Sequence, residues 1–401
     1  MALHKLLLAA SLASSVSAAR LYVSSYAANS STVGKVTTLD LKNGLGAASL
    51  IKLSENSESG SNPTWLDASP DDGNIYVINE GWFDPLASIT SLKKGKDGKL
   101  TKFAKIDIVQ GPVSSQFYNK NKNVAVAHYG GSAITSYKFN KNGTFTTQQE
   151  FIFKTPPGPR PEQEASHVHH SVIDPTGKFI VFPDLGSDEV RVYTIGKDNL
   201  LTAQKSIKTP AAYGPRHAAF WTANGAPVYG QKPSTYLFVI HELINRVTSY
   251  RVSTDASGVP SFTQVFETEL YKGEKPVGTR AAEISVSPDN QFLLASNRNA
   301  TIFSVPNPDP KNSTKIPSDS ITTFKPKADG SLEIVDQAAS GGSFPRHFAL
   351  NKKGDLIAVA NQRSKSVDIF KRNVKTGAIG ERVATQQNFD GEVNFVLWEE
   401  D

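Results

Sequence analysis

The amino-acid sequence predicts an all-β protein, a seven-bladed β-propeller whose ring is closed by its own C-terminal strand. Three observations lead to this prediction. A strand-like motif recurs seven times, a second strand-like motif follows every copy, and the chain ends in a strand that has no repeat of its own. Apolar residues nowhere keep the 3.6-residue spacing of a helix, which argues against a helical solenoid.

The first motif is a short apolar run that ends in a pair of polar or aromatic residues. Its copies lie about 56 residues apart, close to the period of known propeller repeats. The seven copies are LYVSSY, IYVINE, VAVAHY, FIVFPD, LFVIHE, LLASNR and IAVANQ, which end at Tyr26, Glu80, Tyr129, Asp184, Glu242, Arg298 and Gln362.

The second motif is a β-branched residue followed three positions later by an aromatic residue or Leu. It occurs once after each copy of the first motif, at Val36/Leu39, Ile89/Leu92, Ile134/Tyr137, Val190/Tyr193, Val247/Tyr250, Ile321/Phe324 and Val367/Phe370. A third run closed by a turn, such as SVIDPTG or FALNKKG, precedes most copies. With an outer strand added, each repeat has the four strands of a propeller blade.

The two ends of the chain predict how the ring closes. The first copy begins at about Leu21 and lacks the strand that should precede it, whereas a strand without a repeat, VNFVLW, runs from Val393 to Trp398. We expect this segment to form the innermost strand of the first blade, which removes a free sheet edge. The insertion from Asn299 to Asp319 is rich in Pro, Ser and Asn and is expected to form an exposed loop.

The first residues predict export from the cell. Lys5 is followed by a short apolar run and by the small residues Val16-Ser17-Ala18, as in a cleavable signal peptide. The apolar run is too short for a membrane span, and no later stretch is long enough for one. We therefore assign residues 1–19 to a signal peptide and residues 20–401 to a single propeller domain, in a protein that is secreted to the extracellular space or the cell wall.

Two further features fit a secreted protein. Four N-glycosylation sequons are present, at Asn29, Asn142, Asn299 and Asn312, and together with the export signal they predict a glycoprotein. The chain has no cysteine, so disulfides and thiolate metal ligands are excluded. With 43 Lys and Arg against 38 Asp and Glu and no long run of like charges, the sequence gives little support for nucleic-acid binding.

Charged and histidine side chains are predicted to gather at one mouth of the central channel. Adjacent strands of a blade are antiparallel, so each innermost strand starts where the second strand ends, near the axis. At the second-strand ends lie Glu80, Asp184, Glu242 and Arg298, and at the innermost-strand starts lie His167, His169, Arg216, Glu283 and Arg346. Because charges are costly to bury alone, such a ring is either a network of ion pairs or a ligand site.

The individual side chains leave alternatives open. Arg216 and Arg346 suit either ligand binding or struts between blades, paired with Glu242, Asp184 or Glu283. Glu80 and Asp184 suit structural caps as well as substrate contacts. His217 and His347 each follow an arginine on a strand, so strand alternation predicts that they point away from the channel, into the sheet packing. His167 and His169 are two residues apart and share a face, which favours a ligand role.

The chemistry of these groups favours a small anionic substrate and no cofactor. Two histidines with a carboxylate make a known zinc site, but the neighbouring arginines oppose a cation, so no metal is expected. No phosphate-binding glycine loop and no G-x-S-x-G turn is present. Arginine binds carboxylates and phosphates bidentately, and a nearby Glu or His can move protons without a metal.

The sequence resembles the seven-bladed lactonases, which include propeller-type 6-phosphogluconolactonases and fungal 3-carboxy-cis,cis-muconate lactonizing enzymes. The resemblance runs from about Arg20 to the C-terminus and is carried by HVHHSVIDPTGKFIVFPDLG, GPRHAAF, RAAEISVSPDNQFLLASNR and FPRHFALNKKG. It implies a catalytic set of a His, an Arg, a Glu and a second Arg, which by motif are His167 or His169, Arg216, Glu242 and Arg298. Arg346 is a further candidate for binding the substrate anion.

Two hypotheses follow from different classes of protein. In the first, the chain is a secreted, metal-independent lactonase or lactone-forming cyclase acting on a small carboxylated molecule. His169 or Glu242 would then exchange protons, Arg216, Arg298 and Arg346 would bind the anion, and Glu283, Glu80 and Asp184 would complete the substrate site. In the second, it is an extracellular or cell-wall propeller that binds a partner without catalysis, and the charged ring is structural.

Overall fold

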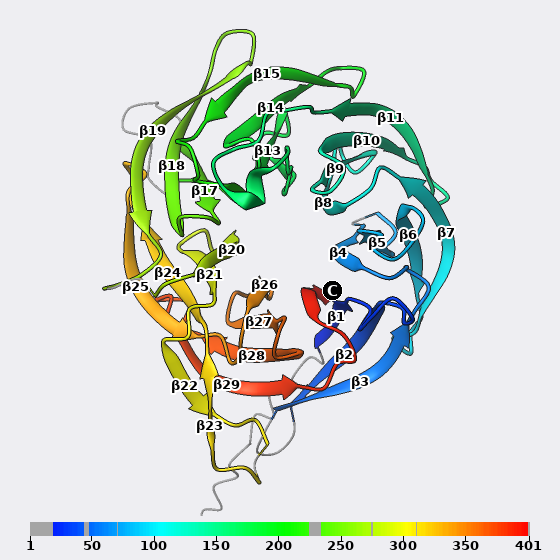
Figure 1. Ribbon diagram of the computed structural model, residues 1–401, viewed down its shortest axis with the longest axis vertical. Helices are drawn as coiled ribbons and strands as arrows, with labels where there is room; N and C mark the ends of the chain where they lie inside the picture. Colours follow the sequence, from blue (N-terminus) through cyan, green and yellow to red (C-terminus); the bar gives the residue numbers. More distant parts are fainter. Residues whose placement is uncertain are drawn as a thin grey trace, which may run out of the picture.

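A computed structural model describes residues 19–43, 48–69, 71–223, 234–273, 276–309 and 311–399 of the chain. These residues form seven four-stranded antiparallel sheets around a central channel, with one additional two-stranded hairpin (Figure 1). The predicted seven-bladed propeller is confirmed. Most of the predicted signal peptide, residues 1–18, lies outside the described residues.

The first three blades use the two ends of the chain and the segments that follow Asn62. From the channel outwards, blade 1 contains β30 (Val393–Glu399), β1 (Ala19–Ser25), β2 (Lys35–Asn43) and β3 (Ala48–Asn56). Blade 2 contains β4 (Pro63–Ala68), β5 (Ile75–Asn79), β6 (Ala87–Lys94) and β7 (Leu100–Ile108). Blade 3 contains β8 (Pro112–Tyr118), β9 (Asn123–His128), β10 (Ala133–Phe139) and β11 (Phe145–Ile152).

Blades 4 and 5 follow in chain order. A 3₁₀ turn, η1 (Pro161–Gln163), leads into blade 4, which contains β12 (Val172–Ile173), β13 (Phe179–Asp184), β14 (Glu189–Ile195) and β15 (Leu201–Lys208). Blade 5 contains β16 (Pro215–Thr222), β17 (Thr235–His241), β18 (Arg246–Thr254) and β19 (Pro260–Glu269).

Blades 6 and 7 complete the ring. Blade 6 contains β20 (Arg280–Val286), β21 (Leu293–Arg298), β24 (Ser320–Pro326) and β25 (Leu332–Ala339). Blade 7 contains β26 (Pro345–Leu350), β27 (Leu356–Asn361), β28 (Ser366–Arg372) and β29 (Ile379–Gln386). The first sequence motif forms the second strand of every blade, and the second motif lies on the third strand.

Ring closure is also as predicted. β30 pairs with β1 in antiparallel register, with Val396 opposite Val23 and Trp398 opposite Leu21. One blade thus combines both ends of the described chain, and Figure 1 shows the last strand beside the first at the channel.

The apolar core lies between the blades. Buried apolar residues of the described chain fall into seven clusters, one between each pair of neighbouring blades. The alternation of each strand explains this, because successive side chains point to opposite faces and so contact opposite neighbours. On β5, for example, Ile75 and Val77 pack toward blade 1, whereas Tyr76 and Ile78 pack toward blade 3.

The insertion between β21 and β24 is more ordered than a loop. β22 (Phe303–Pro306) pairs with β23 (Lys315–Ser318) to make a hairpin that projects from the ring (Figure 1). Its strands form because apolar and polar side chains alternate, as in Phe303-Ser304-Val305. The Arg382 guanidinium of β29 donates a hydrogen bond of 2.8 Å to the Pro306 carbonyl, which ties the hairpin to blade 7.

Candidate active site

A β-bulge near the start of the innermost strands determines which side chains face the channel. In blades 5 and 7 the pairing register shifts between Pro215 and His217 and between Pro345 and His347. Shifts at corresponding places occur in blades 2, 3 and 6. A bulge inserts one residue that the partner strand does not match, so regular alternation fails at that point.

The bulges correct the prediction for His217 and His347. Strand alternation placed these histidines in the sheet packing, but both lie in the channel, where their rings are 6.1 Å and 5.9 Å from the ring of Trp65 across the axis. Since the arginine before each histidine is the extra residue of a bulge, the arginine and the histidine both reach the channel. The prediction was wrong because it assumed an unbroken strand.

Three of the predicted catalytic residues form one ion cluster. Oε2 of Glu242 lies 3.0 Å from Nε of Arg216 and 2.8 Å from a terminal nitrogen of Arg298. The guanidinium of Arg216 also donates to the Ala282 carbonyl at 2.7 Å, and that of Arg298 donates to the Ala281 carbonyl at 2.9 Å. Both arginines are buried, so the cluster joins blades 5 and 6 and fixes two guanidinium groups at the channel.

Electrostatics keep this cluster charged. Burial alone would raise the pKa of Glu242, but the positive charges of Arg298 and Arg216 outweigh burial and lower that pKa below its ordinary value. Burial and the charge of Arg298 lower the pKa of Arg216 to about 9, which leaves the guanidinium protonated at neutral pH. An ionised carboxylate held by two arginines is a weak proton acceptor.

Arg346 differs from the other two arginines. Among the described residues it has no ion pair with a carboxylate, and its guanidinium carbon lies 5.9 Å from the centre of the Tyr26 ring. The Tyr26 hydroxyl donates at 2.5 Å to Glu80, which is buried. Trp82, an exposed side chain, lies beside Tyr26 with ring centres 4.8 Å apart. Arg346 is half-buried, and it lies beside an aromatic wall near the negative charges of Glu80, Glu242 and Glu392. We call this end of the channel, with Arg216, Glu242, Arg298 and Arg346, the arginine mouth.

His167 is held at the rim by two acceptors. Nδ1 lies 2.9 Å from the Tyr129 carbonyl oxygen and Nε2 lies 3.0 Å from Oε1 of Glu164. The imidazole also stacks on the Tyr129 ring at 4.0 Å. Both ring nitrogens of His167 therefore face oxygen atoms of the protein and not the open channel.

His169 reaches deeper and begins a chain of polar groups. Its Nδ1 lies 3.2 Å from Nε2 of His217, and Nδ1 of His217 lies 3.1 Å from Oε1 of Glu283. Nε2 of His347 lies 3.5 Å from the other oxygen of Glu283. Burial, followed by the charge of Arg216, lowers the pKa of both His169 and His217 well below the ordinary value. Both imidazoles are therefore neutral at physiological pH.

These groups form a layer across the middle of the channel, which we call the inner ring. Its members come from innermost strands or from the segment before β12, and they are Trp65, His170, His217, Glu283, His347 and Phe395. His170 stacks on His217 at 4.1 Å, and His347 stacks on Phe395 at 3.7 Å. Trp65, His170 and Phe395 were not identified from the sequence, since only the positions of their strands around the axis bring them together.

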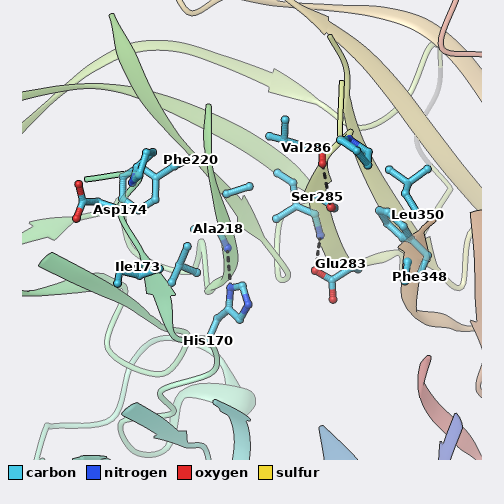
Figure 2. Close-up of a pocket in the computed structure, with 16 residues that line it drawn as sticks. His170, Ile173, Asp174, Ala218, Phe220, Glu283, Ser285, Val286, Phe348 and Leu350 are labelled. Atoms are coloured by element: carbon cyan, nitrogen blue, oxygen red, sulfur yellow. Dashed lines mark hydrogen bonds between the residues drawn. The ribbon is translucent and has the colours of Figure 1, made fainter. Parts of the chain in front are cut away.

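Beyond the inner ring the channel opens into a cavity of about 680 Å³. Figure 2 shows His170 and Glu283 at one end of this cavity and apolar side chains such as Phe220, Val286 and Leu350 along it. These apolar residues come late in β16, β20 and β26, so they lie away from the arginine mouth. The predicted catalytic residues are absent from the cavity lining.

Asp184 and Glu283, the other two predicted substrate contacts, have different surroundings. Asp184 is fully buried and accepts bonds from the His167 backbone N–H at 2.8 Å, the Ser166 hydroxyl at 2.5 Å and Arg191 Nε at 2.9 Å. It therefore holds its own blade together, as the structural alternative predicted. Glu283 belongs to the inner ring, below the mouth.

Other predicted features can be placed on the surface. All four sequon asparagines, Asn29, Asn142, Asn299 and Asn312, are exposed. Across the described ranges, no three His, Asp or Glu side chains are grouped as a metal site would need. In the same part of the chain, no helix has the length and apolar character required to cross a membrane.

Comparison with known proteins agrees with this architecture. The chain is 28% identical over 331 residues to a probable 6-phosphogluconolactonase of Arthroderma benhamiae, covering 82% of this chain and 78% of that protein. It is 27% identical over 326 residues to a 6-phosphogluconolactonase of Formosa agariphila, covering 79% and 83%. The periplasmic gluconolactonase of Pseudomonas aeruginosa has the same fold, with a TM-score of 0.76 at 22% identity, covering 95% of this chain and 99% of that structure.

The family described as the seven-bladed β-propeller lactonases matches residues 20–396, which is nearly the whole described chain. The resemblance inferred from the sequence motifs is therefore confirmed. The chain belongs to the seven-bladed β-propeller lactonase family.

Proposed function

We propose that this protein is a secreted lactonase that hydrolyses a small anionic lactone at the arginine mouth without a metal cofactor. The observation that carries the proposal is Arg346, a guanidinium without a carboxylate partner among the described residues, next to two arginines already paired with Glu242. A free arginine beside a fixed cationic cluster suits a carboxylate or a phosphate on the substrate.

His169 is the general base of this proposal. Nε2 of His169 has no hydrogen-bond partner among the described residues and is not an enclosed atom, so it is open to the channel beside Tyr129. It takes a proton from water while the water oxygen attacks the lactone carbonyl carbon. Arg216 and Arg298 stabilise the negative charge that develops on the carbonyl oxygen. The ring C–O bond then breaks, and the proton on His169 passes to the leaving oxygen, which gives a hydroxy acid.

Glu242 has a different role in this scheme. Its lowered pKa and its two arginine partners favour a charged clamp for Arg216 and Arg298 over the proton-exchanging role considered from the sequence. The assignment of the base to His169 follows from the accessibility of its Nε2 and from the neutral state of its ring.

The names of the relatives support a sugar lactone as the substrate class. Two relatives are named 6-phosphogluconolactonases, and a protein of the same fold is named a periplasmic gluconolactonase. A periplasmic enzyme acts outside the cytoplasm, as the export signal of this chain predicts for it. A carboxylated lactone is the other candidate, and cyclisation of a muconate would use the same anion-binding arginines.

The test measures turnover by the purified secreted protein, with the spontaneous rate subtracted. The substrates are 6-phosphogluconolactone, a carboxylated lactone, neutral gluconolactone and a muconate, each with and without a chelator. We expect chelator-resistant hydrolysis that is lost in folded Arg216→Ala and Glu242→Gln variants. No turnover of any compound by the unaltered protein would instead favour a partner-binding propeller in the extracellular space or the cell wall.

The variant Arg346→Gln tests the binding of the anion. We expect KM for an anionic lactone to rise about 10- to 100-fold, the effect of losing one charge-assisted contact. KM for neutral gluconolactone should stay nearly unchanged, and the melting temperature should fall only modestly, because Arg346 makes no ion pair among the described residues although buried Glu80 loses a nearby positive charge. Equal losses on anionic and neutral lactones would contradict the assignment.

A further inference from the structure

The polar chain behind His169 has a defined hydrogen-bond direction. Oε1 of Glu283 accepts the backbone N–H of Ile284 at 3.0 Å, and the same oxygen faces Nδ1 of His217 at 3.1 Å. An oxygen that already accepts one N–H offers its remaining lone pair to a donor, so Nδ1 of His217 carries the proton. In a neutral ring the other nitrogen, Nε2 of His217, is then an acceptor.

The same logic fixes the proton on His169. Nε2 of His217 accepts, so Nδ1 of His169, which lies 3.2 Å away, must be the donor. That leaves Nε2 of His169 without a proton, as a lone pair open to the channel. Each imidazole nitrogen between Glu283 and the channel is therefore assigned as a hydrogen-bond donor or acceptor. The last of them, Nε2 of His169, can act as a base.

We propose that His217 and Glu283 are positioning residues that hold His169 in the tautomer whose Nε2 can accept a proton at the arginine mouth. This inference rests on the proposed function and deepens it, because it names the groups that make His169 the base. The carboxylate of Glu283 also stabilises the positive charge that His169 acquires when it takes a proton at Nε2, because the Nδ1 proton of His169 can then pass to Nε2 of His217, which leaves the charge on the ring that donates to Glu283. The arrangement extends the His–carboxylate pair of hydrolases by one ring.

The surroundings explain why such support is needed. Arg216 and Arg346 both face His169 with positive charge, and His169 is also buried, so its protonation is opposed from the mouth side. Arg216, His347, Arg346 and Arg298 likewise oppose protonation of His217. Tyr129 meets the edge of His169 and brings no charge at neutral pH, because burial raises the pKa of its hydroxyl. The carboxylate of Glu283, in the inner ring, contacts His217 and so supplies the negative charge that favours protonation.

His347 provides a built-in comparison. It follows an arginine in a second Pro-Arg-His copy and also contacts Glu283, but it faces Oε2 of that carboxylate, whereas His217 faces Oε1. Nδ1 of His347 faces the backbone N–H of Val396 at 3.3 Å and so accepts, which leaves Nε2 to donate toward Glu283. His217 and His347 are thus predicted to be opposite tautomers in equivalent sequence contexts.

The first test determines the tautomers directly and needs no activity. Protein labelled with ¹⁵N-histidine is studied by long-range ¹H–¹⁵N correlation at neutral pH, and single substitutions assign the rings. We expect the proton on Nδ1 in His169 and His217 and on Nε2 in His347. A proton on Nε2 of His217, or on Nε2 of His169, would overturn the proposal even if the protein hydrolyses lactones.

The second test compares the matched variants His217→Phe and His347→Phe, each of which keeps a ring beside Glu283, although only His217 hydrogen-bonds to that carboxylate. We expect kcat to fall about 100-fold for His217→Phe, in the range of general-base catalysis, and to change less than about 3-fold for His347→Phe. Glu283→Gln should lower kcat. It should also lower the pKa of the general base, which is seen on the acidic limb of the kcat/KM profile, since the imidazolium loses its carboxylate. Equal falls of kcat in both Phe variants, with an unchanged pH profile, would show that His217 and Glu283 contribute only packing and do not position His169.

The two tests separate this inference from the proposed function. If the tautomers are as expected and no lactone is hydrolysed, the proposed reaction is wrong, while the assigned tautomers of His169 and His217 remain correct. If lactones are hydrolysed and His217 has the opposite tautomer, the relay is wrong and the lactonase assignment stands.

Discussion

Among the individual residues, two buried histidines make the stability of the fold sensitive to acid. His128 and His241 end the second strands of blades 3 and 5, are fully buried, and each bonds through Nε2 to a threonine on the next strand, at 2.8 Å and 2.9 Å. Burial lowers the pKa of His128 to about 4 and that of His241 to about 3. These rings fold in the neutral state.

The sign of the pH dependence follows from these values. Because the pKa of each ring is lower in the folded chain than in the unfolded chain, the unfolded state binds more protons below about pH 6.5. The stability that each neutral ring contributes is complete above that pH and is lost as the pH falls toward 4 for His128 and toward 3 for His241.

We therefore expect His241→Gln to make the protein less sensitive to acid. Between pH 7.5 and pH 5 the free energy of unfolding of the variant should fall about 2 kcal/mol less than that of the wild type. Denaturant unfolding at the two pH values measures the difference, and His128→Gln should give a similar result. Parallel losses in wild type and variants would show that these rings accept protons in the folded protein without cost.

Single residues also mark how far the sequence could predict the site. The positions of Arg216, Glu242 and Arg298 followed from counting strands, because the ends of second strands and the starts of innermost strands meet at one mouth. The roles within that mouth did not follow. Whether an arginine is paired, as Arg298 is, or unpaired, as Arg346 is, depends on which carboxylate the neighbouring blade brings within a few ångströms.

Among the strands and turns, the bulged innermost strand is the device that places side chains at the channel. Sequence patterns do not reveal a bulge, because Pro-Arg-His reads equally well as an unbroken strand. The error for His217 and His347 came from this ambiguity. The hairpin within the Pro-rich insertion was missed for a related reason, since its strands are only four residues long.

The glycine before the bulge in blade 5 helps to position two members of the ion cluster, Arg216 and Glu242. Gly214 has φ +62°, its N–H donates to Asp188 at 2.8 Å, and its carbonyl accepts the Glu242 N–H at 2.8 Å. Gly111 occupies the same place in blade 3, with the same φ and a bond from the Tyr129 N–H at 2.7 Å. In each of these two blades, the residue that follows the second strand, Glu242 or Tyr129, is therefore held by a glycine carbonyl.

We expect Gly214→Ala to damage activity more than stability alone would explain. The positive φ costs about 1–2 kcal/mol for alanine, and the added Cβ would lie 2.5 Å from Leu243 Cγ, next to Glu242. After correction for unfolded protein, kcat/KM should fall about 10-fold or more, because Arg216 and Glu242 move apart. Thermal unfolding and lactone kinetics are the two measurements.

Gly258→Ala is the control for this prediction. Gly258 has φ +85°, but no heavy atom lies within 4 Å of the position that an alanine methyl group would take, so the variant has backbone strain without a collision. It should lose similar stability from the backbone strain and keep its kcat/KM. A comparable loss of activity in both variants would mean that the bulge geometry tolerates a shift at Gly214.

Across the molecule as a whole, the ring is held by seven interfaces of the same kind, and the two that flank blade 1 contain residues from both ends of the described chain. The cluster between blades 7 and 1 includes Val23 of β1 and Val396 of β30, both fully buried. This closure was predictable because the number of repeats and the strand without a repeat leave one arrangement without a free edge. The family of the chain was predictable too, since its motifs extend over the whole ring.

A disulfide across the closure tests how much the distance in sequence between the paired strands β1 and β30 contributes to the cost of closing the ring. Val23 and Val396 are paired neighbours in β1 and β30, and the chain has no other cysteine, so the double variant Val23→Cys/Val396→Cys can form only the intended bond. The control is Leu66→Cys/Val77→Cys, a pair of the same strand types within blade 2 that closes a short loop. Because a disulfide restricts an unfolded chain more when its loop is longer, oxidation should stabilise the closure pair about 2–3 kcal/mol more than the control. Each oxidised protein is compared with its own reduced form, which removes the cost of the replaced side chains. Equal gains in the two pairs would contradict the expectation that the long loop between the chain ends adds to the cost of closing the ring.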